Sequence, residues 1–200
     1  MTQLFEINTT WLRTIPLFIL PALINLALAL FVVVRFPSTR LNRIFILFIF
    51  LLGLAQFADG MMHLAVTVET ATVWQKIAFA PWVFIAATGV IVVLEYTSSS
   101  RLIESGKHVA LFALPAFLFE LIIFSGNCRH TLIPSSTWGW IANPEHSTIN
   151  HVVYTFITAL SLLMPVLLWT AFWNHRKDRV ARRPFILLSI GVTIPYLGAF

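Results

Sequence analysis

The chain has 200 residues, of which 58% are hydrophobic and only 10% are charged, and its formal net charge is +5. Soluble domains are about one-quarter charged, so this composition excludes an ordinary soluble domain and indicates a membrane protein. The positive charge does not indicate nucleic-acid binding, because the basic residues lie in short gaps between apolar runs and not on one solvated surface. A single cysteine, Cys128, excludes an internal disulfide.

Six apolar runs approach the roughly 20 residues that a helix needs to cross a bilayer. The first run is expected to be a retained anchor and not a cleaved signal peptide, because it stays apolar as far as Val34. The last run has only 16 residues, so we expect a longer protein that continues after Phe200. The sequence predicts an all-α polytopic helical membrane bundle, a single transmembrane domain over residues 1–200, with spans at about 15–34, 44–66, 74–96, 108–125, 151–173 and 185–200.

The basic residues predict the orientation of these spans. Ten of the 13 Lys and Arg residues lie in the gaps after the first, third and fifth spans, and only Arg13, Lys76 and Arg129 lie on the other side. Because Lys and Arg collect on the cytoplasmic side of a membrane protein, we expect the N-terminus outside. The strongly basic gap at 174–183 is explained by this topology and by attraction to anionic lipid.

Several ionisable or polar side chains are predicted to lie at one depth in the outer half of the bilayer. At 1.5 Å per residue, Asp59 is roughly 24 Å along the second span and Glu120 roughly 18 Å along the fourth. A charged side chain at the bilayer centre costs about 2.5–3.5 kcal/mol, so we expect these groups to face a shared, water-filled cavity and not lipid. The residues at this depth are Asp59, His63, Lys76, Glu120, His151 and Tyr154.

These residues form a predicted binding site for a small molecule or a proton. Asp59, His63 and Glu120 are its expected polar core, and Lys76, His151 and Tyr154 are expected around that core. In an alternative interpretation, Asp59 pairs with Lys76 or His63 and only holds the second and third spans together. Glu95 is different, because its place near the cytoplasmic end predicts a structural salt bridge with Arg101 or with an arginine between residues 35 and 43.

The loop at about 126–150 is long for a compact domain and contains Trp138 and Trp140. Tryptophans at the membrane interface often serve only as anchors. The Trp-Gly-Trp sequence favours a packed segment over a loose linker, and we expect Trp138 and Trp140 to form a lid over the cavity.

The sequence contains no motif that predicts catalysis, a metal site or a cofactor. Asp59 and His63 would make half of a metal site, and Cys128, His130 and His146 lie on the same side, but no tight His/Cys spacing accompanies them. We therefore expect no catalytic residues, no metal and no cofactor. Two alternatives stay open: a zinc-dependent membrane hydrolase, and a small transporter or channel subunit in which Asp59 and Glu120 carry protons or cations.

Several short segments resemble one family of membrane sensors. They are "VWQKIAFAPWVF" from Val73, "VVLEYT" from Val92, "LFALPAF" from Leu111 and "ARRPFILLSIGVTIPYLGAF" from Ala181. Together they resemble the N-terminal seven-transmembrane region of bacterial sensor histidine kinases and diguanylate cyclases over about residues 15–200. The matching positions are Trp74, Lys76, Glu95, Tyr96, Pro115 and Pro195.

The resemblance implies a function in signal reception. It implies a multi-pass protein of the bacterial inner membrane, without catalytic activity of its own, that passes a stimulus to a cytoplasmic output domain. It also implies a seventh span and that output domain after Phe200, and a homodimer formed through the full-length protein. The second span departs from the usual aromatic-rich pattern of the family at Asp59 and His63. The expected partners are the lipid bilayer and a small-molecule ligand.

Overall fold

The computed structural model of the protein describes residues 10–36, 38–97, 107–125 and 130–174. Within these ranges, five helices are long and apolar enough to cross a membrane. The predicted class, a polytopic helical membrane bundle, is confirmed. The first five predicted spans each overlap one of these helices, with ends that differ by up to six residues, and the sixth, at 185–200, lies outside the described residues.

The described helical elements follow the apolar runs of the sequence. They are η1 (Ile15–Ile19), α2 (Leu20–Arg35), α3 (Arg40–Leu64), α4 (Val68–Thr97), α6 (Lys107–Phe124) and α7 (Thr148–Asn174). The π-helical turn η1 and α2 belong to a single span, Thr10–Arg35. At the start of α3, the Thr39 hydroxyl accepts a hydrogen bond of 3.2 Å from the backbone N–H of Asn42, which caps the helix.

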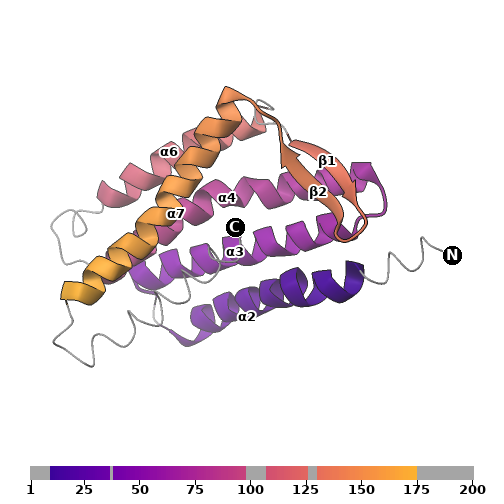
Figure 1. Ribbon diagram of the computed structural model, residues 1–200. Helices are drawn as coiled ribbons and strands as arrows, with labels where there is room; N and C mark the ends of the chain where they lie inside the picture. The colour runs from indigo at the N-terminus through magenta and orange to yellow at the C-terminus, as the bar shows by residue number, and fades with distance from the viewer. Residues whose placement is uncertain (1–9, 37, 98–106, 126–129, 175–200) are drawn as a thin grey trace.

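Helix α4 lies in the middle of the bundle (Figure 1). Helix α3 packs on one side of α4, with α2 beyond it, and α6 and α7 pack on the other side. Two glycines allow close contact between helices: a Cβ on Gly53 would lie 3.0 Å from Leu26 of α2, and a Cβ on Gly89 of α4 would meet the sulfur of Met164 of α7. Small residues at such contacts are typical of membrane helices.

The core of the bundle is formed by α4 and α7, with a contribution from α6. Its buried members include Val83 and Val90 of α4 and Leu160, Met164 and Leu168 of α7. The outward faces carry many exposed large hydrophobic side chains, for example on α2 and α6. Such surfaces would be a liability in water but match hydrocarbon, as expected for helices that contact lipid.

A β-hairpin precedes α7. Strand β1 (His130–Ser135) pairs antiparallel with β2 (Gly139–Pro144), with Ser135 opposite Gly139. In the turn, the Ser135 hydroxyl accepts hydrogen bonds from the N–H groups of Thr137 and Trp138, both at 3.3 Å. Gly139 then takes φ = 71°, a left-handed conformation that suits glycine. The hairpin is an addition to the predicted all-helical fold.

Candidate ligand-binding site

The hairpin is fixed to the end of α3. The Nδ1–H of His63 donates a hydrogen bond to the Trp140 carbonyl oxygen at 2.7 Å, because a carbonyl can only accept. The Trp140 indole Nε1–H donates in turn to the Ala65 carbonyl at 3.1 Å. Gly139 packs so closely that a Cβ there would collide with the His63 carbonyl. His63, predicted to line the cavity, therefore positions the hairpin that covers it.

Aromatic rings strengthen this attachment. The ring of His63 lies 4.9 Å from that of Phe18 and 6.0 Å from that of Trp138, measured between centroids. Phe18 and Trp138 meet edge to face at 6.3 Å. The predicted packing of the Trp138–Trp140 segment is thus confirmed, and both tryptophans attach the hairpin to the bundle.

Beneath the hairpin lies a cavity of about 330 Å³, which we call the Asp59 cavity. Its walls come from α3, α4, α7 and both strands of the hairpin. The lining residues are Asp59, Met62, Gln75, Ala78, Phe79, Trp82, His130, Ala142, Tyr154 and Ile157. Two of the predicted site residues, Asp59 and Tyr154, therefore meet in one cavity although 95 positions separate them in sequence (154 minus 59).

The periodicity of each element explains this lining. On α4, positions 75, 78, 79 and 82 follow the spacing of one helix face, and on α3 positions 59 and 62 do the same. In the hairpin, His130 pairs with Pro144, and Ala142 lies two residues before Pro144, so His130 and Ala142 share one face of the sheet. The cavity is thus specified by ordinary helix and strand geometry.

One wall of the cavity is a cluster of three rings. The Nε2 atom of His130 lies 2.6 Å from the Tyr154 hydroxyl. Phe79 packs against both, with ring centroids 4.4 Å from His130 and 5.9 Å from Tyr154. Burial lowers the pKa of His130 below its usual value, and the carboxylate of Glu145 partly opposes this shift. His130 is therefore mainly neutral at pH 7, and the imidazole tautomer sets whether its Nε2 donates or accepts the hydrogen bond shared with the Tyr154 hydroxyl.

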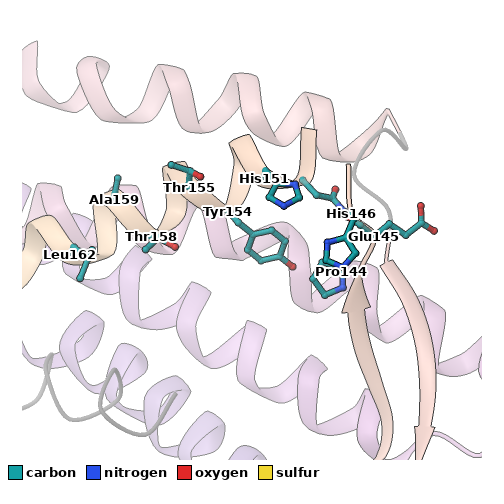
Figure 2. A pocket seen from close by; sticks show the side chains of 10 residues that line it. Pro144, Glu145, His146, His151, Tyr154, Thr155, Thr158, Ala159 and Leu162 are labelled. Atoms are coloured by element: carbon teal, nitrogen blue, oxygen red, sulfur yellow. The ribbon is translucent and has the colours of Figure 1, made fainter. Parts of the chain in front are cut away.

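Tyr154 also borders a second hollow of about 530 Å³, which we call the α7 pocket. Figure 2 shows its lining, which comes from the link between β2 and α7 and from the first turns of α7. His151, another predicted site residue, lies here, and its ring stacks on that of His146 at 6.1 Å. The Nδ1–H of His151 donates to the Ser147 carbonyl at 2.7 Å. His151 is thus near the Asp59 cavity but lines the neighbouring pocket.

Asp59 makes no ion pair within the part of the chain that the structure describes. In particular, no salt bridge joins it to Lys76 or to His63, the two partners that a purely structural role would require. Lys76 is exposed on α4 and lines neither hollow. Asp59 is partly buried and faces the cavity, so its carboxylate is available there.

Glu120 does not reach the Asp59 cavity. It is buried on α6, with 5% of its surface exposed, and within the described residues neither carboxylate oxygen has a hydrogen-bond partner. The structure does not bring Glu120 to Asp59, because α4 lies between α3 and α6. Equal depth in the bilayer did not imply a shared cavity, and a role for Glu120 in binding stays a prediction.

The opposite end of the bundle holds a different acidic residue. The Oε1 atom of Glu95 on α4 lies 2.8 Å from Nε of Arg40 on α3, an ion pair, and 2.9 Å from Nε2 of His108, a fully buried residue of α6. The predicted salt bridge of Glu95 is confirmed, with Arg40 as the partner. This contact joins three helices.

The structure gives no support to a zinc site among its described residues. In that part of the chain, no group of three or more His, Cys, Asp or Glu side chains is arranged to hold a metal ion. Cys128, the expected sulfur ligand, lies outside the described residues.

The fold and the covered cavity define a polytopic helical membrane protein with a polar site at one end. The chain belongs to the family described as the N-terminal 7TM region of histidine kinase, which it matches over residues 17–200. No curated protein and no solved structure compared with the chain matches it. The resemblance to the sensor region of histidine kinases is thereby confirmed.

Membership of this family establishes the cellular location of the protein. The chain is an integral, multi-pass protein of the bacterial inner membrane. The family is the N-terminal membrane region of histidine kinases, so the chain is a membrane sensory input domain of that type.

Eight of the ten lining residues had no place in the predicted site, among them Gln75, Phe79 and Trp82 of α4 and His130 of the hairpin. For the three α4 residues a signal existed, because they lie on one helix face at the level of Asp59. His130 was considered only as a metal ligand. Its position depends on the hairpin, which the helical pattern of the sequence does not indicate.

Proposed function

We propose that this region receives a small molecule in the Asp59 cavity and transmits its occupancy to the cytoplasmic part of a histidine kinase. The observation that carries this proposal is that one cavity is lined by α3, α4, the hairpin and α7. Its volume of about 330 Å³ is within the range of small-molecule sites, about 300–1,000 Å³.

The cavity is suited to transmit a signal because its walls belong to separate elements. A ligand that contacts Asp59 on α3, Trp82 on α4 and Tyr154 on α7 would bind one arrangement of these helices better than another. Only such a difference in affinity shifts a conformational equilibrium. Helix α7 continues from Tyr154 to Asn174 at the other end of the bundle. A movement of α7 at the cavity would therefore be transmitted along one continuous helix.

The distribution of basic residues supports an extracellular position for the cavity. Arg35, Arg40 and Lys107 lie at helix ends opposite the hairpin. We name this the arginine end, and we propose that it faces the cytoplasm, where such residues collect. The hairpin and the Asp59 cavity then face the periplasm.

A substitution that fills the cavity tests the proposal. Ala78 is buried and lines the cavity from α4, so Ala78→Phe would occupy part of its volume. Ala110→Phe on an exposed position of α6 is the matched control. Thermal unfolding of the purified chain would be measured against a panel of organic cations, carboxylates and neutral amphiphiles, and autophosphorylation of the full-length kinase would be measured with any compound that stabilises.

We expect at least one compound class to raise the unfolding temperature of the wild type and of Ala110→Phe but not of Ala78→Phe. The same compound should change autophosphorylation in the wild type and in Ala110→Phe, which bind it, and not in Ala78→Phe. A panel without any stabilising compound, or equal stabilisation of Ala78→Phe, would overturn the proposal. Substrate-dependent uptake into liposomes would favour the transporter alternative instead.

A further inference from the structure

We infer that the ligand of the Asp59 cavity is a small organic cation, of the quaternary or tertiary ammonium type. This inference rests on the proposed function and specifies its ligand class. Its basis is the combination of one unpaired carboxylate with aromatic walls in a single cavity.

The charge of the cavity favours a cation. Of its ten described lining residues, Asp59 is the only acid and none is Lys or Arg. His130 is mainly neutral at pH 7, as shown above, and Lys76 points to the exposed side of α4. A carboxylate within a membrane-spanning helix is expected to have a partner of opposite charge. Among the described residues no side chain forms a salt bridge with Asp59: His63 acts on it only through a Coulomb interaction, and its Nδ1 is engaged by the Trp140 carbonyl. A bound cation would supply the close partner.

The walls of the cavity favour an organic cation over a metal ion. Phe79 and Trp82 on α4, Tyr154 on α7 and the His130 ring present aromatic surfaces to the interior. Aromatic faces attract ammonium groups through the ring quadrupole, and cages of such rings are a known way to bind quaternary ammonium ligands. Hard metal ions require several oxygen ligands, whereas the lining side chains offer one carboxylate, the amide of Gln75 and the Tyr154 hydroxyl.

The neighbouring α7 pocket strengthens the electrostatic preference. Glu145 lines that pocket, which Tyr154 borders together with the Asp59 cavity (Figure 2). Glu145 therefore adds a negative charge near the rim of this pocket, although its carboxylate points away from Tyr154.

The ammonium group has two sources with the same chemistry. It can belong to a free solute or to the headgroup of a choline lipid, because the cavity lies near the end of α3 and the start of α4, beneath the hairpin. Binding experiments in lipid discs of defined composition separate the two, since only the second source makes the lipid a competitor.

The test is equilibrium dialysis of the purified chain, in phosphatidylglycerol discs, against radiolabelled tetramethylammonium. Asp59→Asn is expected to weaken binding at least about tenfold. Glu69→Gln removes an equal charge from an exposed position of α4 that lines neither hollow, and it should leave binding unchanged. Asp59→Glu, which keeps the charge, should restore part of the affinity and shows that loss in Asp59→Asn is not misfolding.

A variant that lacks one aromatic ring tests the proposed cation–π contact. Trp82→Leu should weaken binding by about three- to tenfold through loss of the cation–π contact. Trp169→Leu, on the lipid-exposed side of α7, is the control and should have no effect. Inclusion of phosphatidylcholine in the discs should reduce binding if the natural ligand is a lipid headgroup and leave it unchanged if the ligand is a free solute.

The outcomes distinguish this inference from the proposed function. Equal binding by wild type and Asp59→Asn would overturn the inference, as would saturable binding of carboxylates or neutral compounds in place of cations. In the second case the proposed small-molecule input survives, provided that Ala78→Phe abolishes the binding. Absence of saturable binding by every class would overturn both.

Discussion

Each end of the bundle contains a carboxylate on a membrane-spanning helix, and the two carboxylates differ in whether a basic side chain pairs with them. At the arginine end, Glu95 is held by Arg40 at 2.8 Å and lies 2.9 Å from His108. At the hairpin end, Asp59 faces a cavity and makes no ion pair with the described residues. An acidic residue in a hydrophobic helix is therefore not in itself a sign of function, and the presence or absence of a protein partner separates the two cases.

The two ends also differ in how their helices are held together. The contact of Glu95 fixes α3, α4 and α6 to one another at one end. At the other end, α3, α4 and α7 are separated by a cavity and covered by a hairpin that is attached through few hydrogen bonds. We expect motion to be concentrated at the hairpin end, because the cavity leaves room there for the helices to shift.

The largest expected effect contrasts the two carboxylates directly. Glu95→Gln should lower the free energy of unfolding by about 2–3 kcal/mol, because it leaves Arg40 and the buried His108 without their charged partner. Asp59→Asn should change it by no more than about 0.5 kcal/mol, since no described partner is left behind. Denaturant unfolding in detergent measures both, and equal losses would remove the distinction between the ends.

A smaller effect is expected at the turn of the hairpin. Gly139→Ala should cost about 1–2 kcal/mol for the left-handed conformation alone, and the added Cβ would also meet the His63 carbonyl. The hairpin should separate from α3, which limited proteolysis of the 130–144 segment would detect. Ser136→Ala in the same turn is the control and should stay protected, so increased cleavage of both variants would contradict a specific role for Gly139.

Removal of one hydrogen bond should have a smaller effect still. Trp140→Phe keeps an aromatic ring but loses the Nε1–H that donates to the Ala65 carbonyl, at a cost of about 1 kcal/mol. Trp169→Phe, on the lipid-exposed face of α7, provides the comparison. A chemical-denaturation series that shows equal losses for the two variants would argue against the hydrogen bond as an attachment of the hairpin.

The smallest effect concerns pH. Because burial lowers the pKa of His130, the docked hairpin takes up a proton less readily than an undocked one. Docking should therefore be independent of pH above the ordinary histidine pKa of about 6.5, and should weaken as the pH falls below it. Asp59 and Glu145 are the acids nearest to this change. Spin-label distances between the hairpin and α3 would report it, and a matching acid response in His130→Gln would assign the effect to another group.

Helix rise explains which parts of the site could be predicted from the sequence. Counting residues placed Asp59 and Tyr154 at one depth, and they line one cavity because a helix has a fixed rise per residue. The same count included Lys76 and Glu120, which lie elsewhere. Depth does not determine the direction in which a side chain points around the helix axis, and that direction depends on which helices are neighbours.

The hairpin is the part of the fold that the sequence did not predict. Its strands include Pro134 and Pro144, which are poor strand residues, and the buried and exposed positions of β1 do not alternate regularly. Strand pairing here depends on docking against His63 and Ala65, a contact between segments some 75 residues apart. His130 enters the cavity only through that contact, so its place in the site could not be derived from local sequence.

The most direct measurement of the central claim is the reaction of a cysteine placed in the cavity. In a Cys128→Ser, Ala78→Cys chain, the rates of modification by membrane-impermeant trimethylammonioethyl and sulfonatoethyl methanethiosulfonates would be compared from the periplasmic side. We predict a faster reaction with the cationic reagent, and a fall in the ratio of the two rates on Asp59→Asn. Equal rates that do not depend on Asp59, or a cysteine that is unreactive from that side, would contradict an open cavity governed by an unpaired carboxylate.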